Sequence, residues 1–235
     1  MKTKCFVFLS LVASMTLGSQ YAFSYGRCDF HNWYLSGTAG LEWHSNTKLT
    51  TVTGFEEIKY KPGWSGGFNL GYMFEHARFE IEGLYTYNSI DRVNTYQVNL
   101  YNDLAHPQGH NEDIALLANA FYYLIIGDYF SINFGIGGGV SWNEFQIRSY
   151  FVDLGGFDVF FRGITEKQSL LTWQLILNLS YEHNDCFVIS GGYRYVGMQT
   201  PKEFNRFNSD FDDQITNVQT IPIKQIIELR ISFLF

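Results

Sequence analysis

Apolar and polar residues alternate along most of this chain, and the alternation occurs in eight separate runs. Successive side chains of a β-strand point to opposite faces, so a period of two predicts strands with one apolar and one polar face. The runs cover residues 33–44, 64–74, 78–87, 114–124, 130–143, 171–181, 186–196 and 221–235. The chain is therefore predicted to be all-β, with eight strands.

The connections between these runs alternate between short and long. They are short at 75–77, 127–128 and 183–185, and long, polar and irregular at 45–63, 88–113, 144–170 and 197–220. Short turns on one rim and four long extracellular loops on the other are the plan of an antiparallel up-and-down transmembrane β-barrel. A soluble sandwich also alternates, so the prediction depends on the even strand number, this rhythm and strands long enough to cross a bilayer.

The first two dozen residues have the layout of a secretory signal peptide. Lys2 and Lys4 precede an apolar run over 5–17 that is too short for a transmembrane anchor. Ala22 and Ser24 supply the small residues of a cleavage site, so we expect cleavage after Ser24, with Ala22 as the alternative. The chain then divides into a signal peptide at 1–24 and one barrel domain at 25–235, which we expect in a Gram-negative outer membrane.

Composition agrees with a chain that faces lipid. Of its 235 residues, 17% are charged and 18% aromatic, whereas charged residues average about 25% in soluble domains. The formal charge of −7 lacks the basic footprint of a nucleic-acid binder, so no nucleic-acid partner is expected. Aromatic residues gather near the ends of the runs, where interfacial girdles should lie. They are Trp33, Trp43, Trp64, Phe74, Phe79, Tyr87, Tyr122, Phe130, Trp142, Tyr181, Phe187, Tyr195 and Phe235.

If the apolar faces meet lipid, the polar faces line the lumen. The alternation turns four acids and four bases inward: Glu42, Arg78, Glu80, Glu82, Arg194, Lys224, Glu228 and Arg230. Side chains just fill an eight-stranded barrel, and unpaired charges there are strongly destabilising. Strands three and seven lie opposite each other, so Glu80 or Glu82 should reach Arg194. Strands one and eight are neighbours, which should bring Glu42 near Lys224.

Two functions of such a lumen stay open. A balanced set of charges favours a plugged, structural interior, and the alternative is a gated or selective pore.

Seven short motifs follow the order of the strands. They are Trp33-Tyr34-Leu35-Ser36-Gly37, Arg78-Phe79-Glu80-Ile81-Glu82-Gly83, Ala118-Asn119-Ala120-Phe121-Tyr122, Gly135-Ile136-Gly137, Trp173-Gln174-Leu175, Tyr193-Arg194-Tyr195 and Leu229-Arg230-Ile231. They resemble strands of the opacity-type surface antigens and related outer-membrane proteins, which share the eight-stranded OmpA-type barrel. The resemblance implies that fold. It does not choose a role, because the family includes adhesins, surface antigens and barrels of unknown function.

The last strand carries the sharpest of these resemblances. Leu229, Ile231, Phe233 and Phe235 share one face. This pattern resembles the C-terminal signature by which the outer-membrane insertion machinery recognises its clients, so that machinery is an expected partner.

An enzyme is a further alternative, because some eight-stranded barrels modify lipid A. Trp43-His44-Ser45-Asn46 superficially resembles the His-x-Ser-Asn motif of the deacylases. Here the histidine and serine are adjacent, and neighbouring strand residues point to opposite faces. A nucleophile must reach its base, so we expect no catalytic function.

The long loops contain candidate metal ligands. They are His106, His110, Glu112 and Asp113, which could bind a metal, and Asp210, Asp212 and Asp213, which could bind Ca²⁺. Solvated loop side chains explain both sets better, so we expect no metal and no cofactor. The glycine-rich run 135–139 lacks the helix and lysine of a phosphate-binding loop, and is interpreted as strand glycines that allow close packing.

Two cysteines, Cys28 and Cys186, remain after signal cleavage, and both map to the periplasmic rim. The periplasm is oxidising, so a Cys28–Cys186 disulfide is one hypothesis and two free thiols the other.

The sequence as a whole predicts a monomeric surface antigen, adhesin or envelope-structural protein with a plugged lumen. Its partners would be outer-membrane lipid, lipopolysaccharide and a host or surface ligand bound by the loops, since loops on a rigid scaffold often carry binding. The main alternative is a small porin-like channel or transporter for ions or hydrophobic solutes.

Overall fold

The computed structural model describes residues 32–51, 54–74, 77–97, 100–105, 108–126, 129–148, 150–153, 158–161, 164–184, 186–200, 215–218 and 222–235. The expected signal peptide, its cleavage site and Cys28 lie outside these ranges, as do His106 and the three aspartates at 210, 212 and 213. Among the described residues, no helix is both long and apolar enough to cross a membrane.

Eight antiparallel strands form a closed ring. They are β1 (Trp33–His44), β4 (Gly63–Met73), β5 (Ala77–Gln97), β7 (Gly109–Ile126), β8 (Phe130–Ile147), β11 (Ile164–Asn184), β12 (Phe187–Met198) and β14 (Ile223–Leu234). Their order is β5-β4-β1-β14-β12-β11-β8-β7, and pairing of β7 with β5 closes the ring. The predicted eight-stranded antiparallel barrel is therefore confirmed, and β1 has the bounds that the alternation gives.

The seam of the ring joins the first and last of these strands. Tyr34 is aligned with Leu234 and His44 with Lys224, without a register shift between them. Beyond the ladder, the backbone amide of Phe235 donates to the carbonyl oxygen of Trp33 over 2.9 Å. A closed sheet leaves no unpaired edge, which is the condition for a sheet to stand in lipid.

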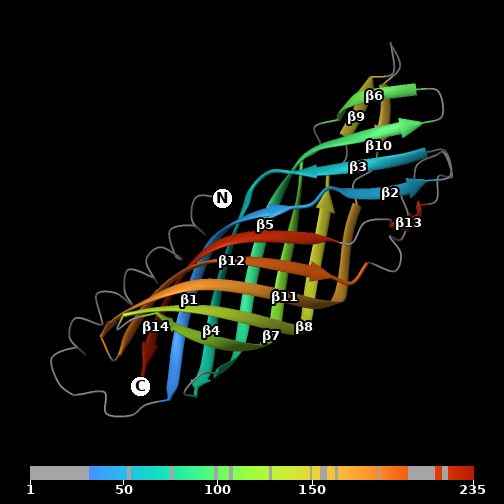
Figure 1. Ribbon diagram of the computed structural model, residues 1–235. Helices are drawn as coiled ribbons and strands as arrows, with labels where there is room; N and C mark the ends of the chain where they lie inside the picture. Colours follow the sequence, from blue (N-terminus) through green and yellow to red (C-terminus); the bar gives the residue numbers. More distant parts are fainter. Residues whose placement is uncertain are drawn as a thin grey trace. The chain divides into compact units, whose positions relative to one another are not determined.

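Six shorter strands lie beyond the ring on the side of the long connections (Figure 1). They are β2 (Thr47–Thr51), β3 (Gly54–Tyr60), β6 (Leu100–Ala105), β9 (Tyr150–Asp153), β10 (Asp158–Phe161) and β13 (Ile215–Val218). β3 pairs with residues 90–97 of β5, and β9 pairs with β10 in a separate two-stranded sheet. The long connections at 88–113 and 144–170 were expected to be irregular, and this is wrong: β5, β7, β8 and β11 continue into them as 18- to 21-residue strands.

The two faces of the ring have the inverted polarity of a membrane barrel. Outward apolar side chains are exposed, among them Ile81 (61%), Ile136 (63%) and Leu171 (63%). The interleaved polar side chains are buried, as Gln174 and Asn133 illustrate at 0%. A soluble barrel would reverse this arrangement.

Aromatic side chains mark both ends of the apolar band. Near the short turns, the ring centroids of Trp33 and Tyr72 lie 5.3 Å apart. Near the loops, Trp64 contacts Tyr85 with 5.1 Å between centroids. These positions match the interfacial girdles expected of a transmembrane barrel.

Candidate functional site: the charged lumen

The structure places all eight charged side chains that the alternation turns inward inside the ring. None is more than 5% exposed: Glu42, Arg78, Glu80, Glu82, Arg194, Lys224, Glu228 and Arg230. They come from β1, β5, β12 and β14, where every second side chain faces the interior.

Five of these residues form a continuous chain of charges, which we call the central ion chain. Arg194 contacts Glu82 and Glu228, each at 2.8 Å between nitrogen and oxygen. Arg230 contacts Glu80 at 2.8 Å and lies 3.8 Å from Glu228. The bond between Glu82 and Arg194 crosses the lumen from β5 to β12, as the opposition of these strands predicts.

Neutral donors complete the surroundings of the two carboxylates on β5. The amide of Asn119 donates to Glu80 over 3.0 Å and to Glu82 over 2.8 Å. Gln174 donates to Glu82 over 2.9 Å and accepts from Arg194 over 2.9 Å. The hydroxyl of Tyr34 donates to Glu80 over 2.7 Å. Charged hydrogen bonds of this kind offset part of the cost of removing ions from water.

Two glycines on β8 make room for inward side chains of the neighbouring strand β7. A Cβ at Gly137 would collide with the side-chain oxygen of Asn119, and one at Gly135 would meet the Phe121 ring at 2.5 Å. The glycine-rich run therefore allows close packing of side chains, as the sequence predicts.

A second group of charges, the Lys224 cluster, lies closer to the loops. The ammonium of Lys224 is 3.3 Å from Glu42, as expected for neighbouring strands, and it also contacts Asp113 and the hydroxyl of Thr86. Asp113 is 3% exposed, and its inward position was missed because it was assigned to a loop. Continuing the parity of Asn119 back along the strand would have found it.

Asp113 changes the charge balance of the interior. Among the described residues, the expected four acids and four bases become five acids, namely Glu42, Glu80, Glu82, Asp113 and Glu228, against four bases. The expected balance is therefore wrong by one carboxyl group, and the excess lies at Lys224, whose single ammonium faces two carboxylates.

Arg78 occupies the end of the lumen near the short turns. Its Nε lies 3.7 Å from Glu80, and its guanidinium stands over the ring of Phe121 at 4.0 Å. Tyr34 and Tyr123 flank it at 5.2 and 5.4 Å. An arginine over aromatic faces gains cation–π attraction where water is excluded.

Two apolar groups separate and cover the charged groups. The middle apolar layer, between the central ion chain and the Lys224 cluster, consists of Leu84, Ala115, Leu117, Val196 and Ile226. The loop-side plug lies beyond the Lys224 cluster and consists of Ile58, Ile90, Val93, Phe145 and Ile147. All ten side chains are at most 5% exposed, so the interior alternates between ionic and apolar levels.

The residues of the lipid A alternative are not arranged for catalysis. Nδ1 of His44 lies 2.6 Å from the backbone carbonyl oxygen of Ser45, and its ring packs on Tyr60 at 4.2 Å. The hydroxyl of Ser45 instead accepts the backbone amide of Ile223 over 3.0 Å. The contacts of the described residues thus do not join the serine hydroxyl to the imidazole.

The candidate metal ligands are split between two faces of β7. His110 and Glu112 lie on the outside, 3.7 Å apart, whereas Asp113 points inward. The described ranges contain no group of three or more histidine, cysteine or acidic residues that could hold a metal ion.

The expected insertion signal lies on the outer face of β14. Leu229 is 53% and Phe235 54% exposed, while Ile231 and Phe233 are half-buried. Phe233 packs on Phe187 of β12, with 5.2 Å between centroids.

Cys186 lies in the turn before β12 and takes part in a disulfide. Its partner is outside the described residues, so the pairing with Cys28 stays a prediction.

Comparison with solved structures finds other barrels. The outer membrane protease OmpT of Escherichia coli is 8% identical, with a TM-score of 0.52, and the match covers 90% of this chain and 99% of that one. OprG of Pseudomonas aeruginosa (12%, TM-score 0.49) and Neisserial surface protein A (17%, TM-score 0.47) each match over 87% of this chain and 97% of their own. No family model and no curated protein matches the chain. At these identities the likeness concerns the fold, which is that of outer-membrane β-barrels.

Proposed function

We propose that this β-barrel stands in the outer membrane with a closed lumen and acts through its long loops, as a surface antigen, adhesin or envelope-structural protein. The exposed apolar band and its two aromatic girdles support a position in a bilayer. The short turns then face the periplasm and the loop strands the outside. The aromatic residues that the sequence places in the long connections are candidates for contact with a surface ligand.

One observation supports the closed lumen: ionic and apolar groups alternate along the axis of the barrel. An ion moving along the axis would have to break the central ion chain and then pass the middle apolar layer, where Leu117 is 1% and Ile226 0% exposed. The loop-side plug is a third obstacle. Hydrophobic constrictions resist ion passage because they exclude water.

A small channel is the second candidate, and a strip of polar groups favours it. The hydroxyls of Ser36 and Thr38 and both amide atoms of Asn69 are buried without a hydrogen-bond partner among the described residues. Unpaired buried polar groups are costly, so this side of the lumen is suited to hold water.

Planar-bilayer conductance distinguishes a closed lumen from a channel. We expect no stable channels from the wild-type protein, because the ionic and apolar levels close the axis in series. Stable wild-type channels whose conductance changes in Arg194→Ala or Glu82→Ala would contradict the closed lumen. Lys167→Ala, on the outer face, is the control because it leaves the lumen unchanged.

The loop role is tested separately by binding. A pull-down with purified surface components should retain the wild-type protein and lose it when residues 98–108 or 148–163 are shortened, since both segments lie outside the loop-side plug. Unchanged binding after both deletions would contradict the loop role.

The remaining parts of the proposal have their own tests. Outer-membrane lipid, lipopolysaccharide and the insertion machinery are the partners expected of such a monomeric barrel. Expression should leave the mass spectrum of lipid A unchanged, and a shifted spectrum would favour an enzyme. The mass of the exported protein should show cleavage after Ser24. Alkylation with and without reduction should show whether Cys28 is linked to Cys186.

A further inference from the structure

The Lys224 cluster lies in a closed compartment of the lumen. The middle apolar layer bounds it on the side of the short turns, and the loop-side plug bounds it on the side of the loops. Its three charged side chains, Glu42, Asp113 and Lys224, are 0, 3 and 1% exposed. Water therefore has little access to these charges, and an imbalance among them must be compensated within the compartment.

The excess carboxyl group of the interior is confined to this compartment. Across the middle apolar layer the described acids and bases balance, as Glu80, Glu82 and Glu228 against Arg78, Arg194 and Arg230. In the compartment, two described carboxyl groups face one ammonium, because Lys224 contacts both Glu42 and Asp113. A net negative charge removed from water is costly, so one of the two carboxyl groups favours its protonated form.

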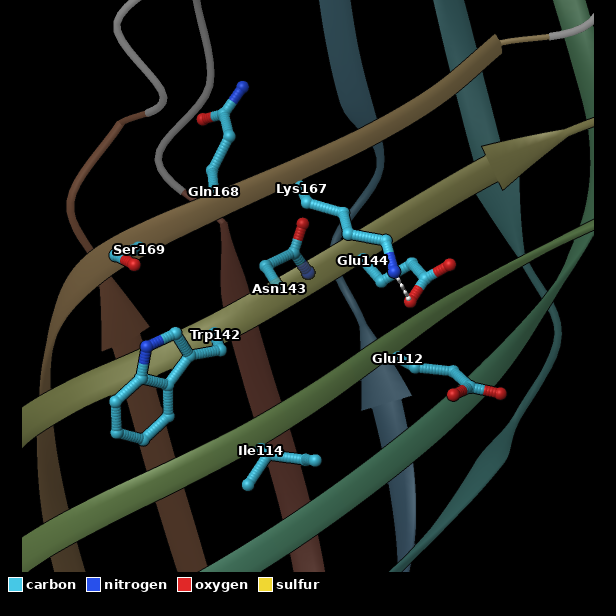
Figure 2. Close-up of a pocket in the computed structure, with 8 residues that line it drawn as sticks. All are labelled: Glu112, Ile114, Trp142, Asn143, Glu144, Lys167, Gln168 and Ser169. Atoms are coloured by element: carbon cyan, nitrogen blue, oxygen red, sulfur yellow. Dashed lines mark ion pairs between the residues drawn. The ribbon is translucent and has the colours of Figure 1, made fainter.

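Asp113 is well supplied with hydrogen-bond donors. The amide of Asn143 on β8, which Figure 2 labels, donates to it over 2.7 Å. Asn111 and Thr86 donate over 3.4 and 3.5 Å, and Lys224 supplies a charged donor. Donors stabilise the charged form of a carboxyl group, so Asp113 keeps its negative charge.

Glu42 is supplied with donors on one oxygen alone. Its Oε1 lies 3.3 Å from Nζ of Lys224 and accepts the amide of Asn88. Its Oε2 is buried without a hydrogen-bond partner among the described residues. An unpaired neutral hydroxyl costs less than an unpaired anionic oxygen, so Glu42 is the carboxyl group that takes the proton.

Two other titratable side chains of the described residues lie beside the compartment, His44 of β1 and Tyr60 of β3. His44 is aligned with Lys224, so a positive imidazolium there would face the ammonium directly. Its Nδ1 donates to the carbonyl oxygen of Ser45 over 2.6 Å, and its ring packs on Tyr60. Burial raises the pKa of the Tyr60 hydroxyl, which therefore stays neutral. Both groups leave the proton to Glu42.

We propose that Glu42 carries a proton in the folded barrel and that this proton makes the closure of the loop-side end depend on pH. With the proton in place, the compartment is neutral. When the proton leaves, the compartment holds one negative charge that the apolar groups on both sides separate from water. The loop-side plug then loosens to admit water, so this end is closed at low pH and opens as the pH rises.

This proton links the stability of the barrel to pH in one direction. An unfolded glutamate ionises near about pH 4.3. Above that pH the folded protein binds a proton that the unfolded chain does not, so the free energy of unfolding falls as the pH rises. Glu42→Gln removes this dependence because an amide stays neutral at every pH. The ratio of the unfolding constants of wild type and variant should therefore rise by up to about tenfold per pH unit.

Urea titration in lipid vesicles from about pH 5 to about pH 9 measures this ratio. The control is Glu144→Gln on the outer face, whose carboxylate pairs with Lys167 at 2.9 Å (Figure 2), and it should follow the wild type at every pH. Hydrogen exchange of the backbone amides of β3 tests the plug. Compared at the same high pH, these amides should exchange faster in the wild type than in Glu42→Gln.

Infrared difference spectroscopy of the folded protein detects the proton itself. The wild type should show the stretching band of a protonated carboxyl group, and the band should disappear as the pH rises. Glu42→Gln should lack the band. Asp113→Asn should also lack it, because Glu42 is then the one carboxyl group beside Lys224 and ionises. His44→Gln should retain it.

Three results would overturn the proposal. One is a wild-type band that persists in Glu42→Gln, which places the proton elsewhere. Another is a band that persists in Asp113→Asn, which shows that the excess charge is not its cause. The third is an identical pH dependence of stability in the wild type and Glu42→Gln.

Discussion

The central ion chain and the loop-side plug close the same lumen with opposite chemistry. In the central ion chain, Glu82 and Arg194 are fully buried, and their charged groups form an ion pair with 2.8 Å between nitrogen and oxygen. In the second, Ile58, Phe145 and Ile147 pack together in a buried apolar cluster that excludes water. A buried ion pair adds little net stability but is costly to break, whereas an apolar cluster loses stability in proportion to what is removed. The comparison predicts that the two regions differ in how they respond to a single change.

The largest effect is expected for Arg194→Ala. The change leaves Glu82 and Glu228 buried without their shared guanidinium, which should lower the free energy of unfolding by about 3–5 kcal/mol. Urea titration in lipid vesicles, followed by tryptophan fluorescence, measures it. If Arg194→Ala lowers the free energy of unfolding by less than an apolar truncation in the loop-side plug does, the expected difference between the two regions is contradicted.

A smaller effect is expected for Ile147→Ala in the loop-side plug. Truncation of a buried isoleucine costs roughly 2–5 kcal/mol, and we expect the lower end because the cluster lies beyond the girdles and can partly collapse. The same titration measures it. Ile147→Val is the graded control, since it should cost only about 0.5–1.5 kcal/mol.

The Lys224 cluster sharpens the comparison, because it has a carboxylate to spare. Glu42→Gln leaves Lys224 paired with Asp113, so the loss should be about 1 kcal/mol, the net worth of one hydrogen bond. Combining it with Asp113→Asn removes both partners of the ammonium and should cost about 3–5 kcal/mol. Additive losses in a double-mutant cycle would show that the two carboxylates do not share the lysine.

The smallest effect is expected for Lys167→Ala on the outer surface. Its pair with Glu144 is 2.9 Å long, close to the 2.8 Å between Arg194 and Glu82, yet the lysine side chain is 70% exposed. Exposed ion pairs contribute about 0–1 kcal/mol, so the stability should change within that range. A larger loss would mean that burial is not what separates the inner pairs from this one.

The parity of the side chains could be predicted from the sequence. The alternation predicts which side chains point into the lumen, including Glu42, Arg194 and Arg230. A shift of the pattern by one residue would turn these charges toward lipid. Within the bilayer, the outward positions of each strand must be apolar because they meet lipid, whereas the inward positions hold both the charges and apolar side chains such as Leu84 and Leu117. The pattern is therefore strong there.

The extension beyond the bilayer could not be predicted in the same way. Ile90 and Val93 on β5 are both buried although they are three residues apart, so the period of two is interrupted here. The pairing of β3 with β5 shifts register between Lys59 and Tyr60, which also disturbs the period. These strands form because their neighbours pair with them, and Asp113 was missed because it lies at this boundary.

The seam between β1 and β14 has a consequence for how the protein assembles. The residues that pair across this seam, such as Tyr34 and Leu234, are separated in sequence by nearly the whole described chain. Contacts so distant in sequence form slowly, because a long loop must close before they contribute any stability. Until the two strands meet, the sheet has two exposed edges, and lipid cannot form hydrogen bonds with their backbone N–H and C=O groups. Closure of the barrel between β1 and β14 is therefore the step that allows the sheet to remain in lipid. Before this step, the chain needs either a chaperone in the aqueous phase or a protein surface that covers the two edges.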